Sequence, residues 1–276
     1  MSQQSKLFAS LLKYWRNKRG LSQLELALKS DVSARHISFL ETGRSQPSEE
    51  MVLRITETLD LPLRERNQLL RDSGFEPVFP EPELSVLDEP GTRKVISLMM
   101  ERQEPYPLVV MDRWYNILQT NQSAQLFLQA CFKDRPEQFP EPPINAVLAL
   151  FRDDQLRPNI LNWEPTARLL LARLHRELLH RPNDDRLSTL LEEVLALPGV
   201  PEDWHTPDPS LGNIAVFPFG FEASGRKLEF VTTLTVFSTP QYVTLQELQL
   251  ESYFPLNQET EERWLELRNL LLQGRL

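Results

Sequence analysis

The first 72 residues alternate between short runs with helical spacing and residues that start or stop helices, and this feature constrains the fold more than any other. The apolar residues of the first run recur at helical spacing: Leu7, Leu11, Leu12 and Trp15. The residues that start or stop helices after this run are Gly20, Ser22, Ser33, Gly43, Pro47-Ser48 and Pro62. Residues 1–72 are therefore expected to form an all-α domain of five helices.

Within this domain, residues 21–43 contain two helices joined by a short turn. Ser22 and Glu25 have capping-box spacing, in which the serine caps the helix N-terminus and the glutamate reaches back to it. The segment resembles the helix-turn-helix of the Xre/λ-repressor family. The residues that carry the resemblance are Gln23, Leu26-Ala27, Val32-Ser33, Ile37, Leu40-Glu41, Gly43-Arg44 and Pro47-Ser48. It implies helices over about 22–29 and 33–41, the second being the recognition helix.

In such a motif the recognition helix enters the major groove and its N-terminal residues meet base edges. Ile37 and Leu40 lie three residues apart and are expected to share the inward face. The outer face then carries the candidate DNA contacts Ser33, Ala34, Arg35, Ser38 and Phe39. Arg35 is the best candidate base reader, because a guanidinium can pair bidentately with guanine; the alternative is a solvated surface cation.

Other residues of the motif suit the DNA backbone or the fold. Ser22 and Gln23 lie at a helix N-terminus, which favours phosphate binding, and Arg44 follows the recognition helix. The carboxylate of Glu41 would be repelled by phosphate. The family resemblance implies instead that Glu41 pairs with Arg16 of the first helix.

Charge is distributed unevenly along the chain. The net charge is −9. Residues 1–72 carry 12 Lys+Arg and 9 Asp+Glu (12 − 9 = +3), and the rest carries 18 and 30 (18 − 30 = −12). The mildly basic head permits phosphate contacts. The sole cysteine, Cys131, rules out an internal disulfide and is expected to be a buried, inert thiol. The absence of any apolar run of about 18 residues predicts no membrane span, and the single cysteine fits a reducing, cytoplasmic location.

Residues 73–104 are expected to form a linker and a connecting helix. The linker is rich in proline, with Pro77, Pro80, Pro82 and Pro90. Val95, Leu98, Met99 and Arg102 then recur at helical offsets, which predicts a helix over about 91–104.

Residues 105–276 have a mixed pattern that indicates an α/β domain. Strands are expected at 108–111, 114–118, 213–219, 227–238 and 247–254, with a turn at Asp112-Arg113. Helices are expected from 121 to 128 and over 144–152, 163–181, 185–197 and 258–272. Phe230, Thr232, Leu234 and Val236 alternate with more polar neighbours, as in a half-buried strand.

This second region resembles the ligand-binding domain of MmyB-like regulators. The resemblance rests on 104–107 (EPYP), Asp112, Asn121, 161–164 (LNWE), 198–204 (PGVPEDW), 234–240 (LTVFSTP) and 243–247 (VTLQE). It implies a PAS-like fold: a small antiparallel sheet with helices on one side and a pocket between them.

The candidate pocket residues are mainly apolar: Met111, Leu118, Phe127, Phe151, Trp163, Arg168, Phe230, Leu234 and Phe254. An apolar pocket with one or two polar groups suits a fatty acid or another lipophilic effector. The alternative is that these residues are ordinary core. Arg168 and His175 lie seven residues apart, so one helix face can hold both.

No enzymatic signature accompanies these features. The chain has no glycine-rich phosphate loop, and His36, His175, His180 and His205 lack metal-ligand spacing. We therefore expect no catalytic residue, metal or cofactor. The leading hypothesis is an effector-responsive homodimer that reads a palindromic operator on double-stranded DNA. The alternative makes residues 105–276 a protein-interaction or dimerisation module without a small ligand, since their acidic character suits a basic partner.

Overall fold

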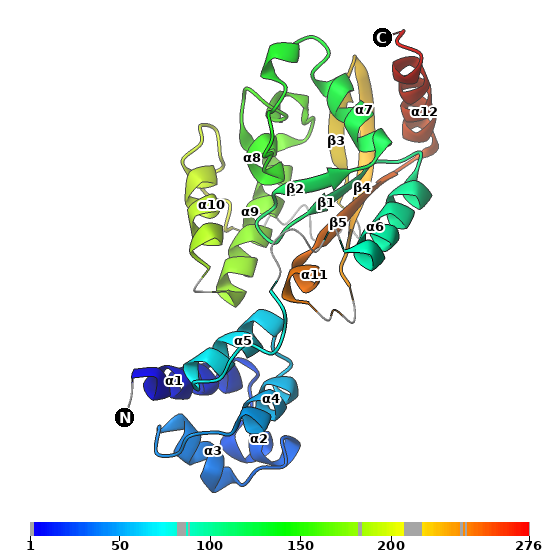
Figure 1. Ribbon diagram of the computed structural model, residues 1–276. Coiled ribbons are helices and arrows are strands. Elements are labelled where there is room, and N and C mark those ends of the chain that lie inside the picture. The colour runs from blue at the N-terminus through cyan, green and yellow to red at the C-terminus, as the bar shows by residue number, and fades with distance from the viewer. Residues whose placement is uncertain are drawn as a thin grey trace. The chain divides into compact units, whose positions relative to one another are not determined.

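The computed structural model describes residues 3–81, 87, 89–181, 184–206, 217–237, 240 and 242–275. The chain divides into two compact units (Figure 1). The helical unit comprises residues 1–88 together with 237–246, and the sheet unit comprises 89–236 and 247–276. The helical unit therefore includes ten residues that lie far along the chain, between two strands of the sheet unit.

Five helices form most of the helical unit, as predicted. They are α1 (Gln3–Lys18), α2 (Gln23–Lys29), α3 (Ala34–Glu41), α4 (Glu49–Thr58) and α5 (Leu63–Asp72). Ser22, Ser33 and Ser48 cap α2, α3 and α4, each accepting a hydrogen bond from a backbone N–H three residues on. The predicted capping box of Ser22 and Glu25 is present. Local side-chain chemistry thus fixes three of the helix starts.

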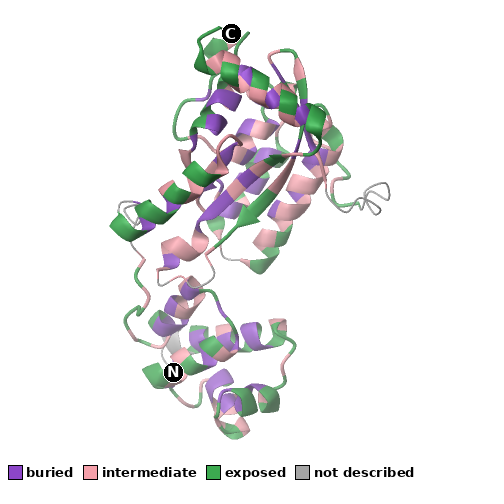
Figure 2. Cartoon of the chain, turned by 90° about the vertical axis from the view of Figure 1, so that its right-hand side faces the viewer, coloured by how far each residue is buried: buried purple, intermediate pink, exposed green. Residues whose placement is uncertain are grey.

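The five helices bury one apolar face each (Figure 2). The core includes Phe8, Leu12, Trp15, Leu26, Ile37, Leu40, Val52, Ile55, Leu59, Leu69 and Leu70. Ile37 and Leu40 are fully buried, as their spacing predicts. On the opposite face of α3, Ala34 packs against this core at its edge, and Arg35 is exposed.

The sheet unit is built on one antiparallel sheet of five strands. They are β1 (Leu108–Met111), β2 (Ile117–Thr120), β3 (Phe219–Ala223), β4 (Arg226–Thr235) and β5 (Gln249–Pro255), in the order β2-β1-β5-β4-β3. The α/β architecture with a small antiparallel sheet that was expected from the sequence is present. In the register, Val109 lies opposite Glu251, and Thr232 lies opposite Tyr253. These four side chains therefore share one face of the sheet.

Helices surround this sheet. They are α6 (Pro90–Gln103), α7 (Gln122–Cys131), α8 (Ala146–Phe151), α9 (Trp163–His180), α10 (Asp185–Leu195), α11 (Val243–Glu247) and α12 (Gln258–Leu272), with short 3-10 turns at Pro136–Gln138 and Arg157–Asn159. Phe127 of α7 and Trp264 of α12 pack against Phe230 of β4, with ring centroids 6.0 and 6.3 Å from that ring. None of the helices in the described part of the chain is long and apolar enough to cross a bilayer.

Three strand predictions differ from the structure. The second strand begins at Ile117 rather than Trp114, because Tyr115 adopts a left-handed φ of 68°. Asp112 holds this turn by accepting hydrogen bonds from the backbone N–H groups of Trp114 and Asn116. The strand predicted at 213–219 falls mostly outside the described residues, and the described strand starts at Phe219. The last strand was predicted to begin at 247, but residues 243–247 form the helix α11.

The inward alternation predicted for 227–238 holds only at the start of β4. Leu228 and Phe230 are buried, whereas Leu234 is 41% exposed. The strand ends at Thr235, so the predicted half-buried face does not extend to Val236.

Candidate functional site

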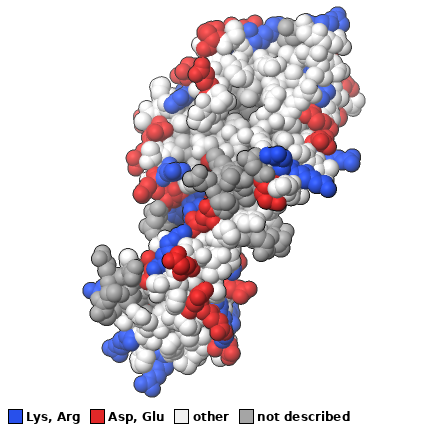
Figure 3. Space-filling model, viewed as in Figure 1, with Lys and Arg blue, Asp and Glu red and all other residues white. Residues whose placement is uncertain are grey.

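The outer face of α3 is a candidate DNA-reading surface. Ser33, Arg35 and Arg44 are exposed, and Ala34, Ser38 and Phe39 are partly buried. The Arg35 guanidinium lies 5.2 Å from the centroid of the Phe39 ring, a cation–π arrangement. Phe39 can therefore position Arg35 as well as pack. Figure 3 shows Lys and Arg atoms along the lower edge of the helical unit, where Figure 1 draws α3.

A buried ion pair lies beneath this surface. Arg16 Nε lies 2.5 Å from Glu41 Oε1, and Arg16 Nη2 lies 3.0 Å from Glu41 Oε2. The ion pair implied by the family resemblance is therefore present. The hydrogen bond from the guanidinium to Glu41 raises the pKa of Arg16. The side-chain amide of Gln23 also donates to Glu41 Oε2, at 2.7 Å, so it is engaged within the fold.

A second candidate site is an apolar cavity in the sheet unit. The centre of a water-sized sphere can occupy about 70 Å³ of it. In this measure one water needs about 10–15 Å³, so the cavity holds a group several times larger than water. Its walls come from strands β1, β2, β3 and β5, helices α7 and α8, and segments between elements: Pro107, Val109, Met111, Ile117, Ala124, Phe127, Leu128, Pro140, Ile144, Ala146, Ala149, Leu150, Leu156, Phe221, Glu251 and Tyr253.

Two of the predicted pocket residues, Met111 and Phe127, line this cavity. The structure does not bring the other seven to it. Phe151 and Phe230 are fully enclosed core residues, because helices cover them. Leu234 and Phe254 are 41% and 40% exposed. Leu118 is partly buried on β2 and does not reach the cavity wall.

The remaining two predicted pocket residues pack elsewhere on α9. Trp163 stacks edge-on against Phe151, with centroids 5.0 Å apart. Arg168 forms ion pairs with Glu164 at 2.9 Å and with Asp203 at 2.7 Å. His175, two turns on, packs against Trp204 at 5.2 Å. Arg168 and His175 therefore both meet the segment at 203–204, away from the cavity wall.

The polar end of the cavity was missed by sequence reasoning. Glu251 and Tyr253 lie two residues apart on β5, so both side chains point to the cavity face. Burial raises the pKa of Glu251, although Arg173 and a hydrogen bond with Thr232 lower it. Burial also raises the pKa of Tyr253. Gln249, Glu251 and Tyr253 alternate with Leu250 and Ser252, so the sequence indicates that the first three share one face of the strand. Which face meets the cavity depends on the sheet register, which the sequence does not give.

Arg173 of α9 is the cation of this region. Its Nη2 donates to Gln249 Oε1 at 3.2 Å, and its Nε lies 3.4 Å from Glu177 Oε1. The Tyr115 hydroxyl donates to the same oxygen of Glu177 at 2.7 Å. Burial raises the pKa of Tyr115. Buried ionisable groups in a cleft are typical of binding sites.

Cys131 is buried in the core of the sheet unit, as expected. Burial raises the pKa of its thiol to about 12. In the described part of the chain no group of His, Cys, Asp and Glu has the arrangement of a metal site.

A helix-turn-helix with an exposed recognition face, joined to an α/β domain with an apolar cavity, defines a DNA-binding regulator that carries a ligand-binding domain. Comparison with protein families supports this class. A helix-turn-helix family matches residues 12–66, and the MmyB-like transcription regulator ligand binding domain matches residues 92–267. The second match covers more than half of the chain, so the chain belongs to the MmyB-like transcription regulators. Both families are of transcription regulators and not of enzymes.

The other comparisons add little. A search of curated proteins found no match. A solved structure described as "Structure of an RNA-binding Light-Oxygen-Voltage Receptor" matches 98% of this chain at 10% identity, with a TM-score of 0.28. The match spans 64% of that protein's length. At this TM-score the similarity carries no argument about this chain.

Proposed function

We propose that this chain is a cytoplasmic, homodimeric regulator that reads a palindromic DNA operator and senses a small lipophilic, fatty-acid-like effector. The observation that carries the effector is the cavity, whose lining is apolar except for Glu251 and Tyr253. Specific ligand sites typically combine such apolar walls with a few placed polar groups. The DNA contacts proposed are Ser33, Ala34, Arg35, Ser38 and Phe39 to bases, and Ser22, Gln23 and Arg44 to phosphates.

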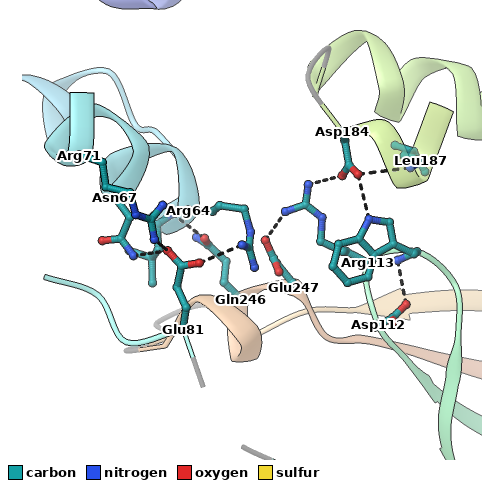
Figure 4. A network of polar contacts seen from close by, with 12 residues as sticks. Arg64, Asn67, Arg71, Glu81, Asp112, Arg113, Asp184, Leu187, Gln246 and Glu247 are labelled. Atoms are coloured by element: carbon teal, nitrogen blue, oxygen red, sulfur yellow. Dashed lines mark hydrogen bonds and ion pairs between the residues drawn. The ribbon is translucent and has the colours of Figure 1, made fainter. Parts of the chain in front are cut away.

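The path of the chain supports effector control of the DNA-binding head. Strand β5, which lines the cavity, begins two residues after α11. Residues 243–246 of α11 belong to the helical unit. Gln246 Oε1 accepts a hydrogen bond from the backbone N–H of Leu63 at 2.7 Å, at the start of α5 (Figure 4). A ligand that displaces β5 therefore also acts on α11, the preceding element of the chain. Gln246 of α11 is hydrogen-bonded to Leu63 of the helical unit.

Further contacts hold the parts of the helical unit together, and others fix the C-terminal end of α11. Glu81 accepts from Arg64 at 2.9 Å and from Asn67 at 2.7 Å, which ties the segment after α5 to that helix. The backbone N–H of Val243 donates to the Pro80 carbonyl at 3.0 Å. Within the sheet unit, Glu247 and Asp184 both pair with Arg113 (Figure 4). The two ends of α11 are thus fixed by different partners.

Native mass spectrometry of the protein purified from its expression host tests the proposal. A reproducible adduct that organic extraction recovers as a lipophilic molecule is expected. Ala149→Leu, which fills the cavity wall, should abolish the adduct, and Ala196→Leu at an exposed position should keep it. A clean apoprotein that binds no lipophilic probe would instead favour the protein-interaction module, for which the −12 charge of residues 73–276 suits a basic partner.

A further inference from the structure

The cavity of the sheet unit has no cationic side chain among the described residues that line it. Its polar lining residues are Glu251 and Tyr253, which lie on one face of β5 and are both only partly buried. A polar head placed elsewhere in the cavity would lose its hydrogen bonds to water without replacement. A carboxyl head therefore has a carboxyl and a phenol as its partners on this wall, and no Lys, Arg or His.

The cation closest to this wall, Arg173 of α9, is engaged by other residues. Its Nε lies 3.4 Å from Glu177 Oε1, and its Nη2 donates to Gln249 Oε1 at 3.2 Å. Arg173 acts on Glu251 but is not a lining residue, and its charge is balanced by that of Glu177. The net charge at the polar end of the cavity is therefore decided by Glu251 and by the head group of the ligand.

The other groups that face Glu251 supply no further charge. Val109 of β1 and Leu234 of β4, which lie opposite Glu251 in the register, are apolar. The described lining residues of α7 and α8 are also apolar. Tyr115 and Tyr253 are the remaining titratable groups, and burial raises the pKa of both phenols, so they stay neutral.

The surroundings of Glu251 favour its protonated form. Burial raises its pKa, and this effect outweighs those of Arg173 and of the hydrogen bond with Thr232, which lower it. A protonated carboxyl is a hydrogen-bond donor, so Glu251 can donate to a carboxylate. Two carboxyls in contact at an apolar site do not both ionise, because like charges repel strongly there. One proton is therefore required to hold such a pair together.

We propose that the head group of the effector is a carboxyl that lies against Glu251 and Tyr253 and shares one proton with the Glu251 carboxyl. Binding then raises the pKa of Glu251 further, so the affinity is complete below the pKa of Glu251 in the free protein and is lost as pH rises above it. This inference rests on the proposed function, because it concerns the effector of that same cavity. It specifies the acid within the fatty-acid-like class and makes its binding dependent on pH.

Decanoate and 1-decanol test it, because they have the same tail and different heads. Their dissociation constants for the delipidated full chain are measured by calorimetry from pH 6 to pH 9, below the micellar concentration. Free decanoate is ionised over this range, since carboxyl pKa values are about 4–5. Decanoate affinity is expected to fall at least tenfold from pH 6 to pH 9. The affinity of 1-decanol, whose hydroxyl both donates and accepts, should change less than threefold.

Two outcomes would contradict the proposal in different ways. Decanoate affinity that is the same at pH 6 and pH 9 would overturn the shared proton, and binding of 1-decanol alone would overturn the acid head. Both results leave a lipophilic effector in place. Binding of neither ligand at any pH, with no adduct on the purified protein, would remove the proposed function and this inference with it.

Glu251→Gln identifies the residue that shares the proton. The amide keeps the shape of the side chain and donates to a carboxylate without taking up a proton, so decanoate affinity should vary less than threefold from pH 6 to pH 9. Glu222→Gln, at an exposed position of β3, is the matched control and should keep the wild-type pH dependence. A wild-type pH dependence in Glu251→Gln would assign the proton to another group.

Proton uptake by the wild-type chain keeps the test valid if Glu251→Gln misfolds. Binding enthalpies of decanoate at pH 9, measured in buffers of different ionisation enthalpy, give the number of protons taken up with the ligand. Uptake of about one proton is expected, because the free protein has lost the Glu251 proton at this pH and the complex holds it. Binding without proton uptake would overturn the proposal.

Discussion

Glu41 receives three hydrogen bonds inside the helical unit, two from Arg16 and one from Gln23. Arg16 also donates to the carbonyl of Leu21 at 2.7 Å, so the guanidinium links α1, the loop after it and α3. The pair is almost fully enclosed, with side chains 9% and 2% exposed. Its role at the residue scale is to set the position of α3 on the rest of the head.

Removing one partner of this pair should destabilise the helical unit strongly. Glu41→Ala leaves the Arg16 guanidinium buried without its counterion, which typically costs about 3–5 kcal/mol. Urea unfolding followed by circular dichroism measures the loss. Glu49→Ala, at an exposed position in the first turn of α4, is the control and should cost far less. Equal stability of the two variants would show that the buried pair contributes nothing net.

Arg35 is expected to carry sequence discrimination. If its guanidinium reads a guanine, Arg35→Ala should weaken operator binding by about 1–3 kcal/mol and relax the preference at one base pair. Fluorescence anisotropy with single-base operator variants measures both quantities. Arg44→Ala, in the loop, should weaken binding about equally on all variants. A uniform loss for Arg35→Ala would make that residue a phosphate contact instead.

Glu251 should make the sheet unit lose stability as pH rises. Its folded pKa is raised by burial. The folded state therefore binds the proton of the Glu251 carboxyl more tightly than the unfolded state does. The resulting stabilisation is complete below the unfolded pKa of about 4.3 and disappears as pH rises through the folded pKa. The urea midpoint of Glu251→Gln, relative to wild type, should consequently increase between pH 5 and pH 8. A constant difference over that range would contradict the burial of this carboxyl.

Among the elements, α5 and α11 depend on each other although they lie far apart in the sequence. The N-cap residue of α5, Pro62, makes no side-chain capping hydrogen bond. The acceptor at its first N–H comes from Gln246, 183 residues away. Helices α2, α3 and α4 were predictable because serine caps them locally. The start of β2 and the existence of α11 were not, because the Tyr115 turn and the contacts of 243–246 are set by tertiary packing.

Gln246→Ala should loosen the start of α5. Loss of a helix-capping acceptor typically costs about 0.5–2 kcal/mol, and the effect is expected to be local. Hydrogen–deuterium exchange of the full chain should show faster exchange at the Leu63 amide, with the core of α4 unchanged. Gln258→Ala, in the exposed first turn of α12, should leave Leu63 as in wild type. Unchanged exchange at Leu63 would argue that α11 does not hold α5.

For the whole molecule, the sequence predicted both regions and their family but not the site within the second. The inward face of α3 follows from spacing within one helix, so Ile37 and Leu40 were assigned inward correctly. The cavity combines residues from four strands and two helices that are distant in sequence, and only two of nine predicted lining residues, Met111 and Phe127, lie at its wall. Arg168 was a reasonable choice by charge, but local partners at Glu164 and Asp203 engage it.

The full chain should protect two operator half-sites related by a two-fold axis. A dimer of helix-turn-helix heads places them about 34–36 Å apart, one turn of DNA. Footprinting gives the protected spacing, and sedimentation at micromolar concentration gives the mass of the free protein. Protection of one asymmetric half-site by a monomer would contradict the homodimer.

The assignment of residues 237–246 to the helical unit has a consequence for engineering. The chain passes between its two units at three points, after 88, after 236 and after 246. The DNA-binding head is therefore not a portable module that ends where its first continuous stretch ends. A hybrid regulator that exchanges only residues 1–88 for the head of a relative would retain a native ten-residue fragment against a foreign α5, so a successful graft must transplant both pieces together.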